Sequence, residues 1–332
     1  MTLSGQPQST AGQHIPVLLN EVIDALAPQD GETYLDGTFG AGGYASAVLE
    51  AADCHVIGID RDPHAIKRAE AFAARYPGRF RILEGCFGDM ATLLEEAGIG
   101  SVDGVMLDIG ISSFQVDEAE RGFSFREDGP LDMRMSQAGK SAADVVNTYG
   151  ETEIANIIYN LGEERRSRAI AAAIVAARID IPFSTTKQLA DLVVGVIGYP
   201  PRKKGKKQVH PATRTFQALR IYVNDELGEL SRGLVSAEKC LAENGRLVVV
   251  AFHSLEDRIV KTFMAERGGR VAGGSRHMPA AVDAGPPPSF RLKIKSAVKP
   301  GSAELDANPR SRSARLRVAV RSEAPAWGVS NA

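Results

Sequence analysis

The chain has 332 residues, of which 44% are hydrophobic and 24% are charged, and its net charge is −2. This balance is typical of a globular protein of about two domains, and it excludes a collagen, a coiled coil or a disordered tail. The longest strongly apolar runs, residues 169–177 and 247–252, are much shorter than the roughly 20 residues that a membrane helix needs. The first 14 residues show no secretory signal, and the three cysteines are too widely spaced for a disulfide framework or a metal site. We therefore expect a soluble, cytoplasmic protein that holds no metal.

Charge is divided unevenly along the chain. Residues 1–130 carry 8 Lys and Arg against 21 Asp and Glu, whereas the remainder carries 31 against 20. Much of the basic excess lies in residues 202–207 and 291–321. Together the two segments favour a polyanionic partner such as a nucleic acid, whose phosphates would supply affinity. The alternative for either segment alone is a solvated loop or an edge strand flanked by basic residues.

The first 108 residues alternate between strands and helices. Strands are predicted at residues 33–36, 55–60, 80–83 and 102–108, with helices between them at 44–51, 65–75 and 90–97. Asp62 followed by Pro63 is typical of the start of the second helix. This alternation with short connections predicts a parallel sheet covered by helices.

The alternation stops after residue 130. Helices are predicted at residues 142–149, 151–161, 165–179 and 186–196, and then at 212–243 with a break near Gly228 or Gly233. Strand patterns return at 245–252, 291–295 and 314–320, and we expect the last two to be antiparallel because no helix separates them. The sequence therefore predicts an α/β fold in which residues 1–130 and 213–322 form one split domain. Residues 131–212 are expected to form an inserted all-helical domain that recognises the substrate.

Residues 37–43 (GTFGAGG) join the first strand to the first helix and predict a ligand site. Glycines let the backbone approach a ligand, and Asp60 at the end of the second strand suits the hydroxyls of a ribose. A glycine turn without a ligand is the alternative. Both a dinucleotide and S-adenosylmethionine fit this arrangement. Asp36 and Asp108 favour S-adenosylmethionine, because carboxylates repel a pyrophosphate and attract an ammonium group.

A series of longer motifs follows in order between residues 14 and 321. They are HIPVLLNEV at 14–22, YLDGTFG at 34–40, LDIGISS at 107–113, RGFSF at 121–125, DGPLDMRM at 128–135, GEER at 162–165, HPATRTFQALR at 210–220, FHSLEDR at 252–258 and NPRSRS at 308–313. In these motifs the chain resembles the RsmH (MraW) family, methyltransferases that use S-adenosylmethionine to modify N4 of a cytidine in small-subunit ribosomal RNA.

The resemblance implies a class I methyltransferase (Rossmann-like) sheet, mostly parallel with an antiparallel terminal strand. It also implies that the substrate is the decoding region of 16S rRNA, within the small ribosomal subunit. The cofactor-binding residues that it implies are Gly42, Gly43, Tyr44, Asp60, Phe87, Asp108 and Gln115. Two positions depart from the family pattern, which usually has His in place of Tyr44 and Pro-Gln in place of Phe114-Gln115.

The exocyclic amine of cytosine is a weak nucleophile, so the enzyme must accept its hydrogens and hold its nitrogen in line with the methyl group. Many amino-methyltransferases have an Asp/Asn-Pro-Pro-aromatic turn after the fourth strand, whereas residues 108–113 lack its prolines and its aromatic residue, so backbone carbonyls or Ser112 are candidates for that role. His253, with Asp257, is a candidate catalytic group, although a lone histidine is more often structural. The predicted RNA-binding residues are Arg202, Lys203, Lys204, Lys206, Lys207, Arg214 and Arg220.

Two other functions stay open at this point. A dinucleotide-dependent oxidoreductase would use the same glycine loop for a nicotinamide cofactor. A non-catalytic RNA-binding assembly factor would retain the pocket and bind RNA without methylating it.

Overall fold

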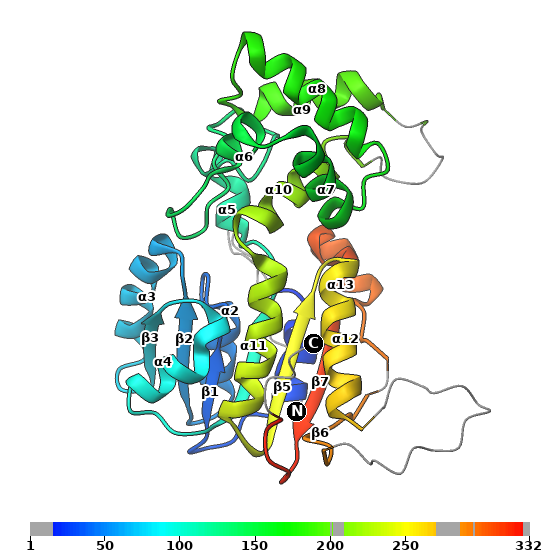
Figure 1. Cartoon of the computed structure of the whole chain (residues 1–332). Helices are drawn as coiled ribbons and strands as arrows, with labels where there is room; N and C mark the ends of the chain where they lie inside the picture. Colours follow the sequence, from blue (N-terminus) through cyan, green and yellow to red (C-terminus); the bar gives the residue numbers. More distant parts are fainter. Residues whose placement is uncertain (1–15, 200, 202–208, 270–285, 295, 328–332) are drawn as a thin grey trace, which may run out of the picture.

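The computed structural model in Figure 1 describes residues 16–199, 201, 209–269, 286–294 and 296–327. Within these residues, seven strands form one sheet in the order β3-β2-β1-β4-β5-β7-β6. The strands are β1 (Thr33–Asp36), β2 (His55–Asp60), β3 (Phe80–Glu84), β4 (Val102–Asp108), β5 (Leu241–Ala251), β6 (Phe290–Arg291) and β7 (Arg315–Arg321). The first five run parallel, and β7 is antiparallel to both β5 and β6. The predicted class I sheet with an antiparallel end is therefore confirmed.

Helices cover both faces of the sheet, which explains why the strands read as continuous apolar runs. One face packs against α1 (Leu19–Leu26), α2 (Gly43–Ala51) and α3 (Pro63–Arg75). The other face packs against α4 (Met90–Glu96), α11 (Glu226–Cys240) and α12 (Ser254–Arg267). Of these helices, α1 and α12 were not predicted from the sequence.

The crevice for a ligand follows from the strand order. Strand β1 lies between β2 and β4, so the connection after β1 leads to one side of it and the later connection to β4 leads to the other side. Ligands of open α/β sheets bind at such a switch point, outside the carboxyl ends of the strands. Here those ends carry Asp36, Asp60 and Asp108.

A separate helical core lies beyond that edge of the sheet, in the upper part of Figure 1. It contains α6 (Ala142–Thr148), α7 (Glu151–Gly162), α8 (Ser167–Asp180), α9 (Thr186–Ile197) and α10 (Thr213–Val223). Its buried side chains include Phe123 before the predicted insertion and Phe216 and Leu219 after it. The helical core therefore includes residues that lie before and after the predicted insertion at residues 131–212.

The predicted break in the long helix after residue 212 was placed too late. Helix α10 ends at Val223 and α11 begins at Glu226, with Asp225 between them in the left-handed region at φ 47°. The Asn224 amide turns back to donate to the carbonyl oxygens of Arg220 and Met133, at 2.9 and 2.7 Å. Gly233 lies inside α11, where a Cβ would stand only 2.5 Å from the Phe87 ring. The lack of a side chain at this position therefore lets α11 pack closely against Phe87.

The carboxyl-terminal part contains less strand than the sequence predicts. The predicted strand at 291–295 is only the two-residue β6, and residue 295 lies outside the described part of the chain. Between β6 and β7 the chain forms α13 (Ser302–Ala307) and the 3-10 helix η3 (Pro309–Ser313). Among the helices described, none has the length and apolarity required to cross a membrane.

Candidate cofactor and active site

A pocket opens at the carboxyl edge of the sheet, lined by the glycine loop and by the residues that follow β2, β3 and β4. Gly40, Ala41 and Gly43 line it directly. Gly42 does not line it but forms the turn, at φ 75°, where a Cβ would stand 2.7 Å from the ring of Phe72. This glycine lets the loop pack closely against Phe72 of helix α3 (Pro63–Arg75), and its contact with the cofactor stays a prediction.

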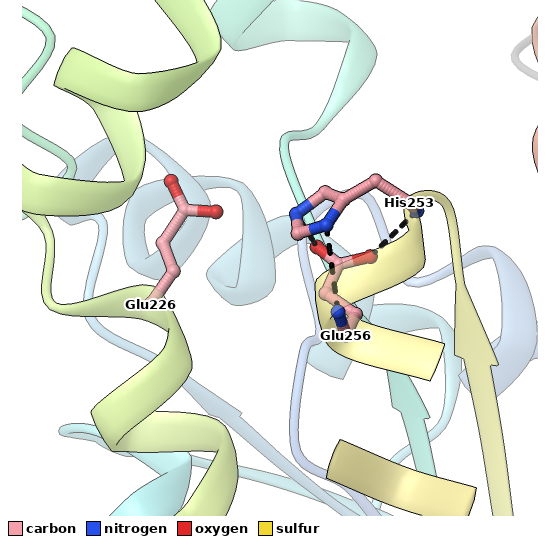
Figure 2. A group of neighbouring side chains, drawn as sticks. All are labelled: Glu226, His253 and Glu256. Carbon is pink, nitrogen blue, oxygen red and sulfur yellow. Dashed lines mark hydrogen bonds and ion pairs between the residues drawn. The ribbon is translucent and has the colours of Figure 1, made fainter. Parts of the chain in front are cut away.

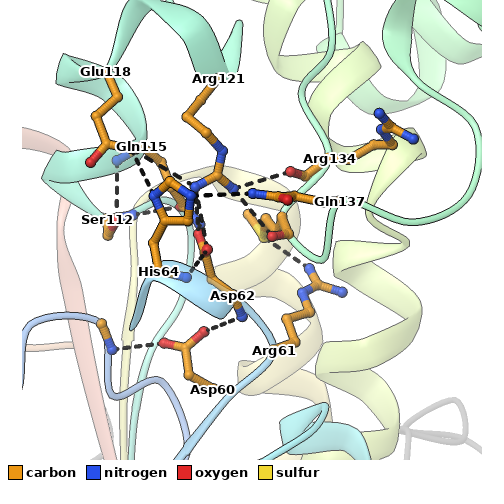
Figure 3. Close-up of polar contacts among 12 residues, drawn as sticks. Asp60, Arg61, Asp62, His64, Ser112, Gln115, Glu118, Arg121, Arg134 and Gln137 are labelled. Atoms are coloured by element: carbon orange, nitrogen blue, oxygen red, sulfur yellow. Dashed lines mark hydrogen bonds and ion pairs between the residues drawn. The ribbon is translucent and has the colours of Figure 1, made fainter. Parts of the chain in front are cut away.

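Asp60 links the glycine loop to the end of β2. Its Oδ2 accepts the Gly40 amide hydrogen at 2.8 Å, and its Oδ1 accepts that of Asp62 at 2.9 Å, as Figure 3 shows. Burial raises the pKa of Asp60 above its usual value. Each carboxylate oxygen retains a further lone pair, so Asp60 can still accept hydrogen bonds from the hydroxyls of a ribose.

Asp36 is buried and Asp108 is partly buried at the same edge, and of the two Asp108 lines the pocket. Oδ2 of Asp36 and Oδ1 of Asp108 have no hydrogen-bond partner among the described residues. Burial raises the pKa of Asp36 to about 7, and burial together with the charge of Asp36 raises that of Asp108 well above its usual value. Buried carboxylates left unpaired are costly, and a bound cation would offset that cost. The pocket therefore fits an ammonium or sulfonium group and disfavours a pyrophosphate.

Phe87 forms the wall of the pocket that follows β3, in the short helix η1 (Phe87–Asp89). Its backbone N–H donates to Oε1 of Glu229 on α11 at 3.1 Å, which fixes the ring relative to that helix. An aromatic wall beside the Asp60 carboxylate suits the adenine and ribose of one nucleoside. Arg61 pairs with the same Glu229 at 2.6 Å and also lines the pocket, a contact that the sequence analysis missed.

Gln115 lines the pocket from α5 (Ser113–Asp117), but its amide is held by the protein. Nε2 donates to Oδ2 of Asp62 at 2.8 Å, and Oε1 accepts the Ser112 amide hydrogen at 3.0 Å (Figure 3). Although burial opposes ionisation of Asp62, hydrogen bonds from Arg121 and Gln115 hold its pKa below the usual value. This network fixes the segment after β4 against the start of α3.

The two departures from the family pattern have local explanations. Tyr44 is buried at the start of α2, lines the pocket, and donates its hydroxyl hydrogen to the carbonyl oxygen of Val17. Phe114 is 37% exposed and lies under the guanidinium of Arg68, 4.4 Å from its ring centroid. Both aromatic side chains thus close walls of the pocket.

His253 stands at the start of α12, next to the pocket residue Phe252. Its Nδ1 accepts the Glu256 amide hydrogen at 3.4 Å, and its Nε2 lies 2.8 Å from Oε1 of Glu256. Figure 2 shows the carboxylate of Glu226 on α11 facing the same imidazole. Atoms of the three side chains lie within 4.8 Å of one another, a spacing that could hold a metal ion. However, the guanidinium of Arg220 already binds both carboxylate oxygens of Glu226, at 2.7 and 2.8 Å.

Two predicted positions, Asp257 and Arg220, differ in the structure. Asp257 does not join His253 at the substrate side but pairs with Arg317 on β7, at 2.7 Å. Arg220 was predicted to belong to an exposed phosphate-binding face, which is wrong: its side chain is 13% exposed and neutralises the buried Glu226. Arg214 is about half exposed and donates to the carbonyl oxygen of Glu163 at 3.1 Å.

The rest of the predicted basic surface divides into two parts. The five basic residues predicted between 202 and 207 lie outside the described residues. In the segment 291–321, Arg317 pairs with Asp257, and the buried Arg321 donates to the carbonyl oxygens of Glu238 and Ser289. These two arginines therefore stabilise the fold.

A mostly parallel sheet with an antiparallel end, a glycine loop, an aspartate at the end of β2 and two buried carboxylates together define a class I methyltransferase that uses S-adenosylmethionine. The chain belongs to the MraW methylase family, whose model matches residues 11–322. It is 58% identical to the ribosomal RNA small subunit methyltransferase H of Rhodospirillum rubrum, over 96% of this chain and 97% of that protein. It is 57% identical to the protein of the same name from Hyphomonas neptunium, over 98% of this chain and 94% of the other.

Proposed function

We propose that this chain transfers a methyl group from S-adenosylmethionine to the N4 amine of a cytidine in the decoding region of 16S rRNA. The main support is the sequence identity of 58% and 57%, over 96% and 98% of this chain, with enzymes named for methylation of small-subunit ribosomal RNA. The buried pair Asp36 and Asp108 adds a site for the positive charge of the methyl donor. The same support disfavours a dinucleotide-dependent oxidoreductase, because these carboxylates would repel a pyrophosphate.

Different residues of the site suit different parts of the cofactor. Asp60 and Phe87 suit the nucleoside of the cofactor, while Asp36 and Asp108 suit its cationic end. When bound, S-adenosylmethionine supplies an activated methyl group and its own leaving group. The segment 108–112 follows β4 at the pocket wall, where backbone carbonyls or Ser112 would accept the hydrogens of the cytosine amine.

The RNA is expected to approach from the side of the helical unit. A cytosine must leave a base stack before its amine can react, so the target lies in a loop or is flipped out. Arg214 on α10 of the helical unit is about half exposed and would contact phosphates, as would the basic residues predicted between 202 and 207. We place this reaction in the cytoplasm, on rRNA within the small ribosomal subunit.

The decisive experiment is mass mapping of methylated nucleosides in 16S rRNA from cells with and without the protein. We expect N4-methylated cytidine at one site of the decoding region to disappear in the deletion strain and to return when the gene is restored. RNA binding by the purified chain with no change in methylated nucleosides would instead identify a non-catalytic assembly factor.

A direct catalytic role of His253 is tested by His253→Asn. Asparagine is a good residue at a helix start, so this variant keeps an acceptor for the Glu256 amide hydrogen while it removes the imidazole. If the imidazole accepts a proton from the amine, kcat should fall about 100-fold. The affinity for S-adenosylhomocysteine should be unchanged, because His253 does not line the pocket. Near-wild-type turnover would leave His253 only its role at the start of α12.

A further inference from the structure

Pro16 and Val17, at the amino-terminal end of the described residues, line the same pocket as Asp108. Pro16 packs on the glycine loop, where a Cβ on Gly43 would stand 2.4 Å from its ring. The next residue, Val17, accepts the hydroxyl hydrogen of Tyr44, whose pKa is raised by burial and then by the charges of Asp108 and Asp36. Tyr44 and Asp108 line the same pocket.

The segment of α13 and η3 contacts this amino-terminal end of the described residues. Oε1 of Glu304 in α13 accepts the Leu18 amide hydrogen at 2.7 Å. In Figure 1 this orange segment stands at the end of the sheet that faces the helical unit. Two of its residues, Asn308 and Arg310, line the pocket itself. Both belong to the motif NPRSRS, to which no function has been assigned above.

Arg310 reaches from this segment to α5, whose Phe114 and Gln115 line the pocket. Its Nη2 lies 2.7 Å from Oδ1 of Asp117, the last residue of α5. The two side chains are 44% and 61% exposed, and an ion pair so open to water contributes little to stability. A guanidinium has five N–H donors in a planar fork, a geometry that suits a carboxylate.

The amino-acid end of S-adenosylmethionine needs such a group. Its ammonium suits Asp36 and Asp108, but the same two side chains repel its carboxylate. Three arginines line the described part of the pocket. Arg61 is held by Glu229 at 2.6 Å beside Phe87, and Arg68 lies over the ring of Phe114. Of the three, only Arg310 comes from the segment that contacts Leu18, next to the pocket residues Pro16 and Val17.

We propose that Arg310, together with Asn308, binds the carboxylate of the cofactor's amino-acid end, and that Asp117 holds Arg310 across the pocket. The chain would then recognise both charges of the amino-acid end, one from the sheet and one from its carboxyl-terminal segment. This inference rests on S-adenosylmethionine as the cofactor and is independent of the RNA target.

The test compares S-adenosylhomocysteine with its decarboxylated analogue, which keeps the adenosine, the sulfur and the amine. Affinities of both ligands are measured by calorimetry for the wild type, Arg310→Ala and Arg310→Gln. The wild type should bind S-adenosylhomocysteine at least about tenfold more tightly than the analogue, the effect of one charge-assisted hydrogen bond. The two variants should lose that preference. Their affinity for S-adenosylhomocysteine should fall about tenfold, while their affinity for the analogue should equal that of the wild type.

Two further variants sharpen the result. Arg312→Ala, at an exposed position that does not line the pocket, should keep the full preference. The proposal is overturned if the Arg310 variants reduce the affinity for both ligands equally or for neither. It is also overturned if only Arg68→Ala abolishes the preference for S-adenosylhomocysteine. Failure of the wild type to bind S-adenosylhomocysteine at all would instead overturn the cofactor assignment, and this inference with it.

Discussion

Replacement of Asp108 by asparagine is expected to lower the affinity for S-adenosylmethionine about 100-fold and to raise the thermal stability of the ligand-free protein. Removing one partner of a buried charge pair in a complex costs roughly 2–5 kcal/mol. In the ligand-free chain Oδ1 of the same carboxyl group is buried and has no hydrogen-bond partner among the described residues, so its removal relieves a cost. Calorimetry and thermal unfolding of the variant measure the two effects.

Asp103→Asn is the matched control for this prediction. Asp103 lies on the same strand at its other end, where Oδ2 accepts the Thr33 amide hydrogen at 2.9 Å, and asparagine can accept the same bond. Its affinity for S-adenosylmethionine should equal that of the wild type. Equal affinities of the Asp108 variant and the wild type would show that this carboxylate does not bind the donor's cationic end.

The raised pKa of Asp36 predicts how the stability of the ligand-free wild type and its affinity for S-adenosylmethionine depend on pH. Because the pKa of Asp36 is raised from 3.8 to about 7, the folded ligand-free chain binds a proton that the unfolded chain has released. The stability of the ligand-free chain should therefore fall as pH rises from about 4 through 7, by the contribution of this group. A bound cation favours the ionised form, so the affinity for S-adenosylmethionine should rise over the upper part of that range.

Replacement of Arg220 by methionine is expected to destabilise the protein by about 3–5 kcal/mol, because it leaves the buried Glu226 without its partner. The loss should appear as a lower midpoint of urea unfolding. The double variant Arg220→Met with Glu226→Leu should recover most of it, since an apolar pair needs no charge compensation.

Arg214→Met is the control, because Arg214 lies on the same helix with its side chain 54% exposed. A surface ion pair contributes about 1 kcal/mol or less, so the unfolding midpoint should barely move. If Arg220→Met were as stable as Arg214→Met and only weakened RNA binding, the ion pair with Glu226 would not be the role of Arg220.

The sequence predicted the cofactor pocket better than the surface for RNA. Asp60 and Asp108 could be placed because each ends a strand with a clear apolar pattern, and the carboxyl ends of parallel strands meet at one edge. The functions of Arg220 and Asp257 were misjudged because a charged residue on a helix has the same local pattern whether it faces water or a buried partner. The partners, Glu226 and Arg317, come from the next helix and from the last strand.

By itself, the sequence determined the alternation of strands and helices, the helical insertion, the glycine loop and the acidic ends of the strands. Each of these depends on periodicity or on residues that are neighbours in the chain. Only the tertiary structure decided that Asp36 and Asp108 are buried together, that Arg220 is neutralised by Glu226, and that the segment carrying Arg310 lies over the cofactor pocket. Burial and long-range charge pairing depend on which elements pack together, and no local pattern in the chain records that choice.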